Sequence, residues 1–457
     1  MEGIPDRGEV EAALERHSAD YLEVRLDDTA TNRIVYRGRE LEEIGRTRSF
    51  GGNVRALVRG GWGFVSFNEP TGLREKVEEA VEAARQVGRE ASMLAEVEPV
   101  IDSVPLDLRK DPRTIPLAAK KRLLDGYNET MLSVDGVTST TITYYDGHKR
   151  VVFASSEGSY IEQERIDVVS RLSATARKNG DMQQASMSLG ALNDFSYVET
   201  LEETARHLGE RAVELLSAPY VKAGTYPVVL DPILAGVFCH EAFGHLSESD
   251  FVYENERMKE IMVLGKQFGQ PHLNIVDGAA VPGLRGSFKY DDEGAAAQKT
   301  DLIREGILVG RLHSRETAGK MGEAVTGNAR ALDYRFPPIV RMTNTYIEPG
   351  ELNFEDLIAD IDEGVYARNW FGGTTSMEMF TFSAGEAYMI RNGKIAEMLR
   401  PVKLTGNLFT TLMNIDALGD DMDFNQGGGC GKAGQMPLPV SNGSPHIRIQ
   451  DCVVGER

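Results

Sequence analysis

Alternating apolar and polar residues predict several β-strands in the N-terminal part of the chain. Residues 21–26 alternate like a half-buried strand, and residues 33–36 form a shorter strand candidate. Residues 51–65 are typical of a hairpin around a glycine turn. The spacing of amphipathic helices is found in three segments, residues 10–18, 73–87 and 117–133.

Three further strand-like runs predict an antiparallel meander. Residues 138–145 and 150–155 are separated by Asp146-Gly147-His148, where we expect a turn, and residues 159–173 continue the sheet. A long amphipathic helix is expected over residues 197–216. An antiparallel sheet with helices packed against it makes the predicted fold class α+β.

A chain of 457 residues exceeds the ~250–300 residues that one hydrophobic core usually serves, so at least two domains are expected. We place the boundary at Ser217-Ala218-Pro219. It separates an N-terminal α+β domain, residues 1–217, from a C-terminal domain, residues 218–457. The second domain is predicted to be rich in strands, because glycines punctuate it from residue 275 onward.

Two local signals stand out in the C-terminal domain. Asp231-Pro232 follows a strand candidate at residues 226–230 and has the pattern of a helix N-cap with proline at the first helical position. The helix that begins there would carry His240. Further along, Asn392-Gly393 lies between two short strand candidates and strongly predicts a hairpin turn.

Composition and charge narrow the possible functions. With 41% hydrophobic and 26% charged residues, the chain has the composition of a soluble globular protein. Its formal net charge of -20 disfavours direct binding of DNA or RNA, which requires a basic surface. We find no signal peptide and no stretch of the ~20 apolar residues that a membrane span requires. Three cysteines do not suggest a disulfide framework, so we expect a cytoplasmic protein.

The segment His240-Glu241-Ala242-Phe243-Gly244-His245 is the strongest chemical signal. Imidazoles are preferred zinc ligands, and a glutamate next to one can act as a base on metal-bound water. However, the two histidines are five residues apart, which separates them by ~140° on a regular α-helix. Joint ligation requires a π-bulge or a helix that unwinds near Gly244. The alternative is two unrelated histidines on different sides of a helix.

Cys430 lies in a second glycine-rich segment, Gly427-Gly428-Gly429-Cys430-Gly431. The formal G-x-G-x-x-G pattern from Gly429 to Gly434 does not indicate a dinucleotide site, because prolines follow where the helix should be. The residues around Lys432 do not form a Walker A loop either. Cys430 is thus either a small residue in a turn, which the segment alone favours, or a metal ligand.

Four other residues near these segments leave alternatives open. Glu248 and Asp250 could be ligands, could orient imidazole N–H groups, or could form a solvated acidic helix end. Cys239 is expected to be a buried small hydrophobic residue. Among the remaining histidines, only His446 is close enough to Cys430 in sequence to be a spare ligand.

Taken together, the His240–Asp250 and Gly429–Gln435 segments resemble the TldD/PmbA family of zinc peptidases, once called modulators of DNA gyrase. The resemblance extends over nearly the whole chain. It is supported by Asp291-Asp292-Glu293-Gly294, by residues 326–330 and 341–345, and by the 52–64 hairpin. Because both metal motifs are present, the chain resembles the TldD class rather than the PmbA (TldE) class.

The resemblance implies zinc held by His240, His245 and Cys430, with Glu241 as the catalytic base. It also implies a two-domain α+β fold, unfolded peptides or proteins as substrates, and a PmbA/TldE-like partner subunit or a homodimer. Three ligands would leave the fourth tetrahedral position for water, as in catalytic zinc sites. Lys432 is a candidate to stabilise the oxyanion.

Other functions remain open from the sequence. The chain could be a non-catalytic assembly subunit with a structural metal, or a metal amidase for small molecules. The old family name suggests a nucleic-acid or topoisomerase modulator, although the net charge argues against direct DNA contact.

Overall fold

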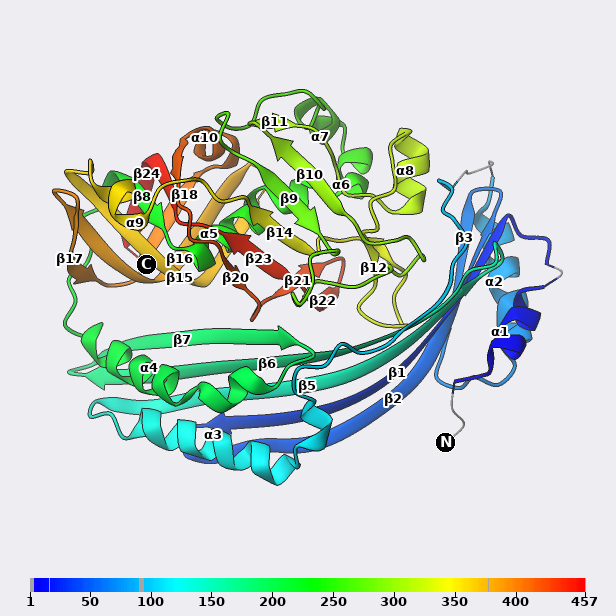
Figure 1. Cartoon of the computed structure of the whole chain (residues 1–457), viewed down its shortest axis with the longest axis horizontal. Coiled ribbons are helices and arrows are strands. Elements are labelled where there is room, and N and C mark those ends of the chain that lie inside the picture. The colour runs from blue at the N-terminus through cyan, green and yellow to red at the C-terminus, as the bar shows by residue number, and fades with distance from the viewer. Residues whose placement is uncertain (1–3, 16, 90–93, 377, 457) are drawn as a thin grey trace.

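The computed structural model describes residues 4–15, 17–89, 94–376 and 378–456. Its N-terminal part is one long, curved, mainly antiparallel sheet with helices at its outer face, shown below the C-terminal part in Figure 1. The elements of this part are α1 (Arg7–Leu14), β1 (Tyr21–Arg37), β2 (Glu40–Val58), β3 (Gly61–Phe67), α2 (Leu73–Val87), β4 (Ile101–Val104), a 3-10 turn (Pro112–Thr114), α3 (Leu117–Leu132), β5 (Val137–Ser155), β6 (Tyr160–Lys178), β7 (Asp181–Leu192), a 3-10 turn (Ser196–Thr200) and α4 (Glu202–Glu214).

The strand order of this sheet is β3-β2-β1-β5-β6, and both β4 and β7 pair with the outer edge of β6. Two buried clusters lie beneath it. Helices α1 and α2 cover one cluster, which includes Val24, Val54 and Val77, at one end of the sheet. Helices α3 and α4 cover the other, which includes Ile142 and Leu124. The N-terminal α+β prediction is confirmed.

Two predicted breaks in the sheet were wrong. The turn expected at Asp146-Gly147-His148 lies inside β5. The separate strand candidates at residues 21–26 and 33–36 both belong to the single strand β1. The Asp146 carboxylate is buried and accepts hydrogen bonds from Lys120 Nζ at 2.5 Å and from Asn32 Nδ2 at 2.8 Å. A polar residue that usually marks a turn can therefore stay within a strand, because buried partners satisfy it.

Predicted helices agree with the structure to within a few residues. The helix predicted over residues 73–87 has these bounds, whereas the first one begins earlier, at Arg7, and ends at Leu14. Residue 16 of that prediction lies outside the described residues. The helix predicted over residues 197–216 is a 3-10 turn followed by α4.

The C-terminal part is rich in strands, as predicted. Its elements are β8 (Gly224–Leu230), α5 (Pro232–Cys239), a π turn (His240–Gly244), a 3-10 turn (His245–Ser247), α6 (Ser249–Glu254), α7 (Glu256–Ile261), β9 (Ile275–Gly278), β10 (Lys299–Arg304), β11 (Ile307–Leu308), α8 (Arg315–Met321), β12 (Ala329–Arg330), β13 (Ile339–Val340), β14 (Asn344–Ile347), α9 (Phe354–Ile358), β15 (Glu363–Ser376), β16 (Met379–Arg391), β17 (Lys394–Leu399), β18 (Val402–Asn407), α10 (Leu408–Met413), β19 (Ile415–Leu418), β20 (Asp423–Asn425), β21 (Gly429–Lys432), β22 (Gln435–Pro439), β23 (Ser441–Ser444) and β24 (Ile447–Glu456).

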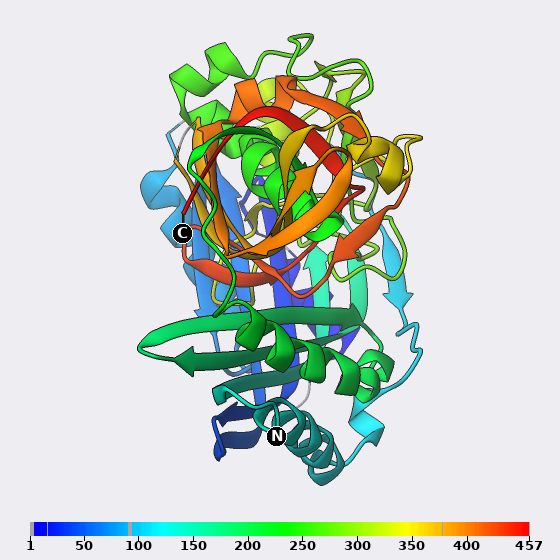
Figure 2. The ribbon, with the colours of Figure 1, turned by 90° about the vertical axis from the view of Figure 1, so that its left-hand side faces the viewer.

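Two sheets enclose the helix that leads to the histidines. Strands β15, β8, β24, β18 and β16 pair in a ring, because β15 also pairs with β16, and Figure 2 shows this barrel near the top. A second sheet has the order β11-β10-β9-β14-β23-β20. Helix α5 contacts strands of both sheets, and its residues from Leu234 to Cys239 are buried in the main core. The predicted Asn392-Gly393 hairpin joins β16 to β17.

Within the described residues, we find no helix that is long and apolar enough to cross a membrane.

Candidate metal centre

The two histidines lie where helix α5 ends. The predicted N-cap is present: the Asp231 carboxylate accepts a hydrogen bond from the Leu234 N–H at 2.9 Å, and Pro232 is the first helical residue. From this cap, α5 passes through the core to Cys239, and His240 follows directly. The cap thus fixes where the first imidazole emerges.

A π turn brings the second imidazole close to the first. The His245 N–H donates to the His240 carbonyl, an i to i+5 bond that widens the turn. The ring centroids of His240 and His245 are 5.2 Å apart, with an angle of 81° between the ring planes. The predicted departure from a regular helix is confirmed. A Cβ atom at Gly244 would lie 2.0 Å from Met342 Sδ, so a larger residue there would require the Met342 side chain to shift.

Cys430 reaches the histidines from β21, on a short hairpin with β22. Its Sγ atom lies 3.6 Å from His245 Nε2, and the candidate ligand atoms of His240, His245 and Cys430 all lie within 4.8 Å of one another. Buried Arg341 donates to the Cys430 carbonyl at 2.9 Å, which fixes the backbone of the hairpin at this point.

The donor set of two imidazoles and one thiol fits zinc, which prefers nitrogen and sulfur ligands. His240 Nδ1 is buried and has no hydrogen-bond partner among the described residues. An orphaned buried nitrogen is unusual in a folded protein, and a bound ion is one physical explanation of it. The cluster is therefore a candidate metal centre.

Electrostatics at the cluster favour a thiolate. Burial raises the pKa of the Cys430 thiol, but His240 and His245 lower this pKa by a larger amount. The resulting pKa is about 5. Cys239 behaves differently, because burial raises the pKa of its thiol and no cation opposes that effect. Cys239 is thus the small buried residue that was expected, whereas the surroundings of Cys430 favour its thiolate form.

Glu248 is buried behind the second histidine. Its carboxylate lies 3.0 Å from His245 Nδ1 and 3.1 Å from Lys432 Nζ, and Lys432 also pairs with Asp250 at 2.6 Å. Burial alone would raise the pKa of Glu248, but His245 and Lys432 lower it to about 2. The contact with His245 agrees with the prediction that Glu248 orients an imidazole. The alternative of a solvated acidic helix end was wrong for Glu248, because this side chain is buried.

Lys432 is not free to act on an oxyanion. Its ammonium contacts Glu248, Asp250 and the Val340 carbonyl, so its three N–H groups all have partners. Glu241 differs from Lys432, because its side chain is partly exposed and no hydrogen bond or ion pair joins it to another described residue. His446 lies elsewhere: it contacts Asp421 and Tyr366 and is not part of the cluster.

Family models match the chain along most of its length. The PmbA/TldA metallopeptidase domain 1 matches residues 22–84, the central domain matches residues 110–218, and the C-terminal domain matches residues 223–456. This chain belongs to the PmbA/TldD family. Since all three models describe metallopeptidase domains, it is a metallopeptidase. The models divide the N-terminal part into two units, and our two-domain division remains a prediction.

Curated relatives agree with this assignment. A metalloprotease of Synechocystis sp. is 49% identical over 439 residues, which cover 96% of this chain and 95% of the relative. A zinc metalloprotease TldD homolog of Saccharolobus solfataricus is 34% identical over 322 residues, which cover 70% of this chain and 72% of the relative.

Solved structures show the same fold at low sequence identity. A protein of Thermotoga maritima described as a modulator of a DNA gyrase has a TM-score of 0.80 at 20% identity, covering 98% of this chain and 99% of its own. TldE from Thermococcus kodakarensis has a TM-score of 0.76 at 16% identity, covering 96% of this chain and 97% of its own.

The sequence did not reveal what Arg341 and Lys432 do at the cluster. In the sequence, each of these two cations lies next to a glycine or a short strand, as many ordinary surface residues do. Arg341 is fully buried, and Lys432 bridges acids that follow the second histidine. The charge of Glu248 and Asp250, opposite that of Lys432, was the only available signal.

Proposed function

We propose that this protein is a zinc-dependent peptidase in which His240, His245 and Cys430 hold the metal and Glu241 is the general base. The main support is the approach of the three ligand atoms within 4.8 Å across the π turn. A set of three nitrogen and sulfur ligands is typical of catalytic zinc, because it leaves one position open. The relative named as a zinc metalloprotease supports the choice of metal.

Zinc held by His240, His245 and Cys430 would supply a Lewis acid and would make water a sufficiently strong acid to be activated near neutral pH. Glu241, directly after the first ligand, takes the proton of the attacking water and later delivers one to the leaving amine. Its lack of other partners leaves its carboxylate available for this role. Glu248 keeps the His245 ring in place by accepting from Nδ1, which directs Nε2 toward Cys430.

We further propose that the substrates are unfolded peptides or proteins and that the chain works as a dimer, with a TldE-like subunit or with itself. A strand-rich catalytic domain suits an extended peptide that adds to a sheet edge, which reads backbone more than side chains. The structural similarity to TldE is consistent with such a pairing.

The test combines metal content with cleavage of unfolded casein. We expect about one zinc per chain in the wild type, the count of a single catalytic site. Zinc and cleavage should both be lost in Cys430→Ala, whereas Cys452→Ala, which removes another buried cysteine, should keep both. Glu241→Gln should keep zinc and lose cleavage.

Three results would contradict the proposal. Zinc that survives in Cys430→Ala would exclude that ligand. A Glu241→Gln protein that still cleaves casein would exclude the base. Loss of the folded state on removal of zinc, with no cleavage by the intact protein or by its mixture with a TldE-like subunit, would favour a structural metal instead.

A further inference from the structure

A cavity of about 1080 Å³ lies between the long N-terminal sheet and the loops of the C-terminal part. Strands β1, β5 and β6 line one side, and residues 279–292, 330–335 and 427–429 line the other. The three residues of the candidate metal centre do not line it, although Gly429 precedes Cys430 directly. At this size it matches or exceeds the ~300–1,000 Å³ of typical ligand pockets.

The charge of this cavity is opposite to that of the whole chain. Its lining has eight Arg or Lys residues and six Asp or Glu residues, whereas the chain has 50 basic and 70 acidic residues. Unpaired positive charge in a cavity of an acidic protein attracts anions to that place. Asp27 and Asp102, which do not line the cavity, neutralise three of these cations, so the excess of positive charge rests on the cations that lack such partners.

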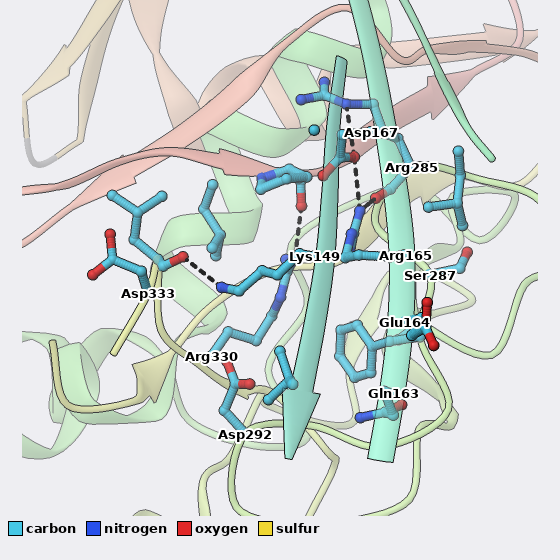
Figure 3. A pocket seen from close by; sticks show the side chains of 18 of the residues that line it. Lys149, Gln163, Glu164, Arg165, Asp167, Arg285, Ser287, Asp292, Arg330 and Asp333 are labelled. Atoms are coloured by element: carbon cyan, nitrogen blue, oxygen red, sulfur yellow. Dashed lines mark hydrogen bonds and ion pairs between the residues drawn. The ribbon is translucent and has the colours of Figure 1, made fainter. Parts of the chain in front are cut away.

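Three guanidinium groups carry the excess, those of Arg165, Arg285 and Arg330. Arg165 pairs with Asp167 at 2.9 Å, and Arg285 Nε lies 3.4 Å from the same carboxylate, as Figure 3 shows. Arg330 donates only to the Met342 and Pro439 carbonyls, and no carboxylate of the described residues forms an ion pair with it. The Asp167 carboxylate thus serves two of these cations, and the third has no carboxylate of its own.

The three cations also repel one another. Burial lowers the pKa of Arg330 to about 9, and the positive charges of Arg165 and Arg341 contribute to that decrease. Burial and Arg165 lower the pKa of Arg285 in the same way, while Asp167 opposes the change. An anion bound between these groups would offset the repulsion.

We propose that this cavity is a binding site for carboxylate-bearing peptides, with the carboxylate held by Arg165, Arg285 and Arg330. Guanidinium groups bind carboxylates through paired, charge-assisted hydrogen bonds. The remaining wall suits an apolar peptide body, because Val169, Val281 and Leu438 also line the cavity. The choice of a peptide rests on the proposed peptidase function, whereas the anion site does not.

The site is joined to the segment that precedes Cys430. Arg285 Nη1 donates to the Gln426 carbonyl at 2.8 Å and also to the Gly428 carbonyl. The same arginine thus lines the cavity and holds the loop from which β21 begins. A peptide bound there would lie beside this loop, outside the metal centre.

Binding is best measured by calorimetry on metal-free Glu241→Gln protein, which separates it from metal loading and from cleavage. The probes are an N-acetylated apolar peptide with a free C-terminal carboxylate, its C-terminal amide, and an amide with one internal glutamate. We expect the free acid to bind at least about tenfold more tightly than the plain amide, a difference of ~1.4 kcal/mol, since charge-assisted hydrogen bonds are stronger than neutral ones. Tight binding of the glutamate-containing amide would identify a side-chain carboxylate as the source.

Three variants test the location. Arg165→Gln removes a cation from the cavity and should weaken binding of the preferred acid about tenfold, whereas Arg171→Gln, on the same strand but outside the cavity, should not. Ala280→Trp should block binding without changing any charge, because Ala280 is an exposed residue of the cavity wall. Equal affinity for both acids and the plain amide, or unchanged binding in Ala280→Trp, would overturn the proposal.

Discussion

Single buried carboxylates decide much of the chemistry of this protein. Glu248 is 1% exposed and links an imidazole of the candidate metal centre to a lysine ammonium. A buried charge is stable only when it is paired and hydrogen-bonded, and here His245 and Lys432 meet that requirement. The orientation of the His245 ring thus depends on a residue outside the ligand set.

We expect Glu248→Gln to reduce zinc affinity about 10–100-fold, because partners that orient a ligand typically contribute that much. The affinity can be measured by competition with a zinc chelator. Asp250→Asn is the matched control, since Asp250 contacts the same Lys432 but not His245. Equal loss of affinity in both variants would assign the effect to Lys432 and contradict a direct role of Glu248.

Asp231, the N-cap of α5, should make stability depend on pH. Burial raises the pKa of its carboxyl from 3.8 to about 6, although two backbone N–H groups oppose this. The folded state therefore binds the proton more tightly, so the stabilisation is present below about pH 4 and is lost as pH rises through about 6. Asp231→Asn should gain up to ~3 kcal/mol relative to the wild type between pH 4 and 7. Urea unfolding across this range measures the difference, and parallel curves would contradict it.

Among the elements, the glycine segment before β21 has a strict steric requirement. A Cβ atom on Gly427 would lie 2.2 Å from the Ser188 carbonyl carbon and oxygen of β7, so the loop contacts the backbone of the N-terminal sheet. Gly428, the next residue, has open space around its Cβ position. Close approach, not flexibility, explains the first of these glycines.

Gly427→Ala should therefore destabilise the protein by ~1–3 kcal/mol, the usual cost of overpacking, and should also reduce zinc content. Gly428→Ala should change stability by less than about 0.5 kcal/mol, as for an unconstrained surface position. Thermal unfolding and metal analysis of the two variants check this. An equal loss of stability in the two variants would contradict this prediction.

At the scale of the whole molecule, buried ion pairs join the N-terminal sheet to the C-terminal part. Arg55 of β2 donates to Glu23 at 2.7 Å and to Glu293 at 3.2 Å, and all three side chains are buried. Glu293 belongs to the segment Asp291-Asp292-Glu293-Gly294, so a motif that supported the family resemblance holds the two parts of the chain together.

Arg55→Leu should destabilise the protein by about 3–5 kcal/mol, because it leaves two carboxylates buried without their cation. Arg48→Leu on the same strand is the control, since Arg48 is exposed and an exposed ion pair is worth at most about 1 kcal/mol. Urea unfolding followed by fluorescence measures both. Similar stabilities for the two variants would show that the buried pairs do not join the parts.

Local patterns predicted the elements where neighbours in sequence determine them. Asp231-Pro232 predicted a helix start, Asn392-Gly393 predicted a hairpin, and residues 73–87 predicted α2. The patterns failed at Asp146, where Lys120 from α3 and Asn32 from β1 satisfy a carboxylate inside a strand. Segments that are distant in sequence surround such a residue, so the local pattern of apolar and polar residues does not reveal its partners.

The sequence by itself determined the α+β class, which depends on residue type and local spacing, and its motifs carried a family resemblance that implied the three residues that could hold a metal. Only the tertiary structure decided that the π turn forms, that β21 brings Cys430 to within 3.6 Å of His245, and that Glu248 is buried behind this ring. The reason is physical: the three contacts are made across packed elements, and their geometry follows from the core and the buried charges that hold those elements together.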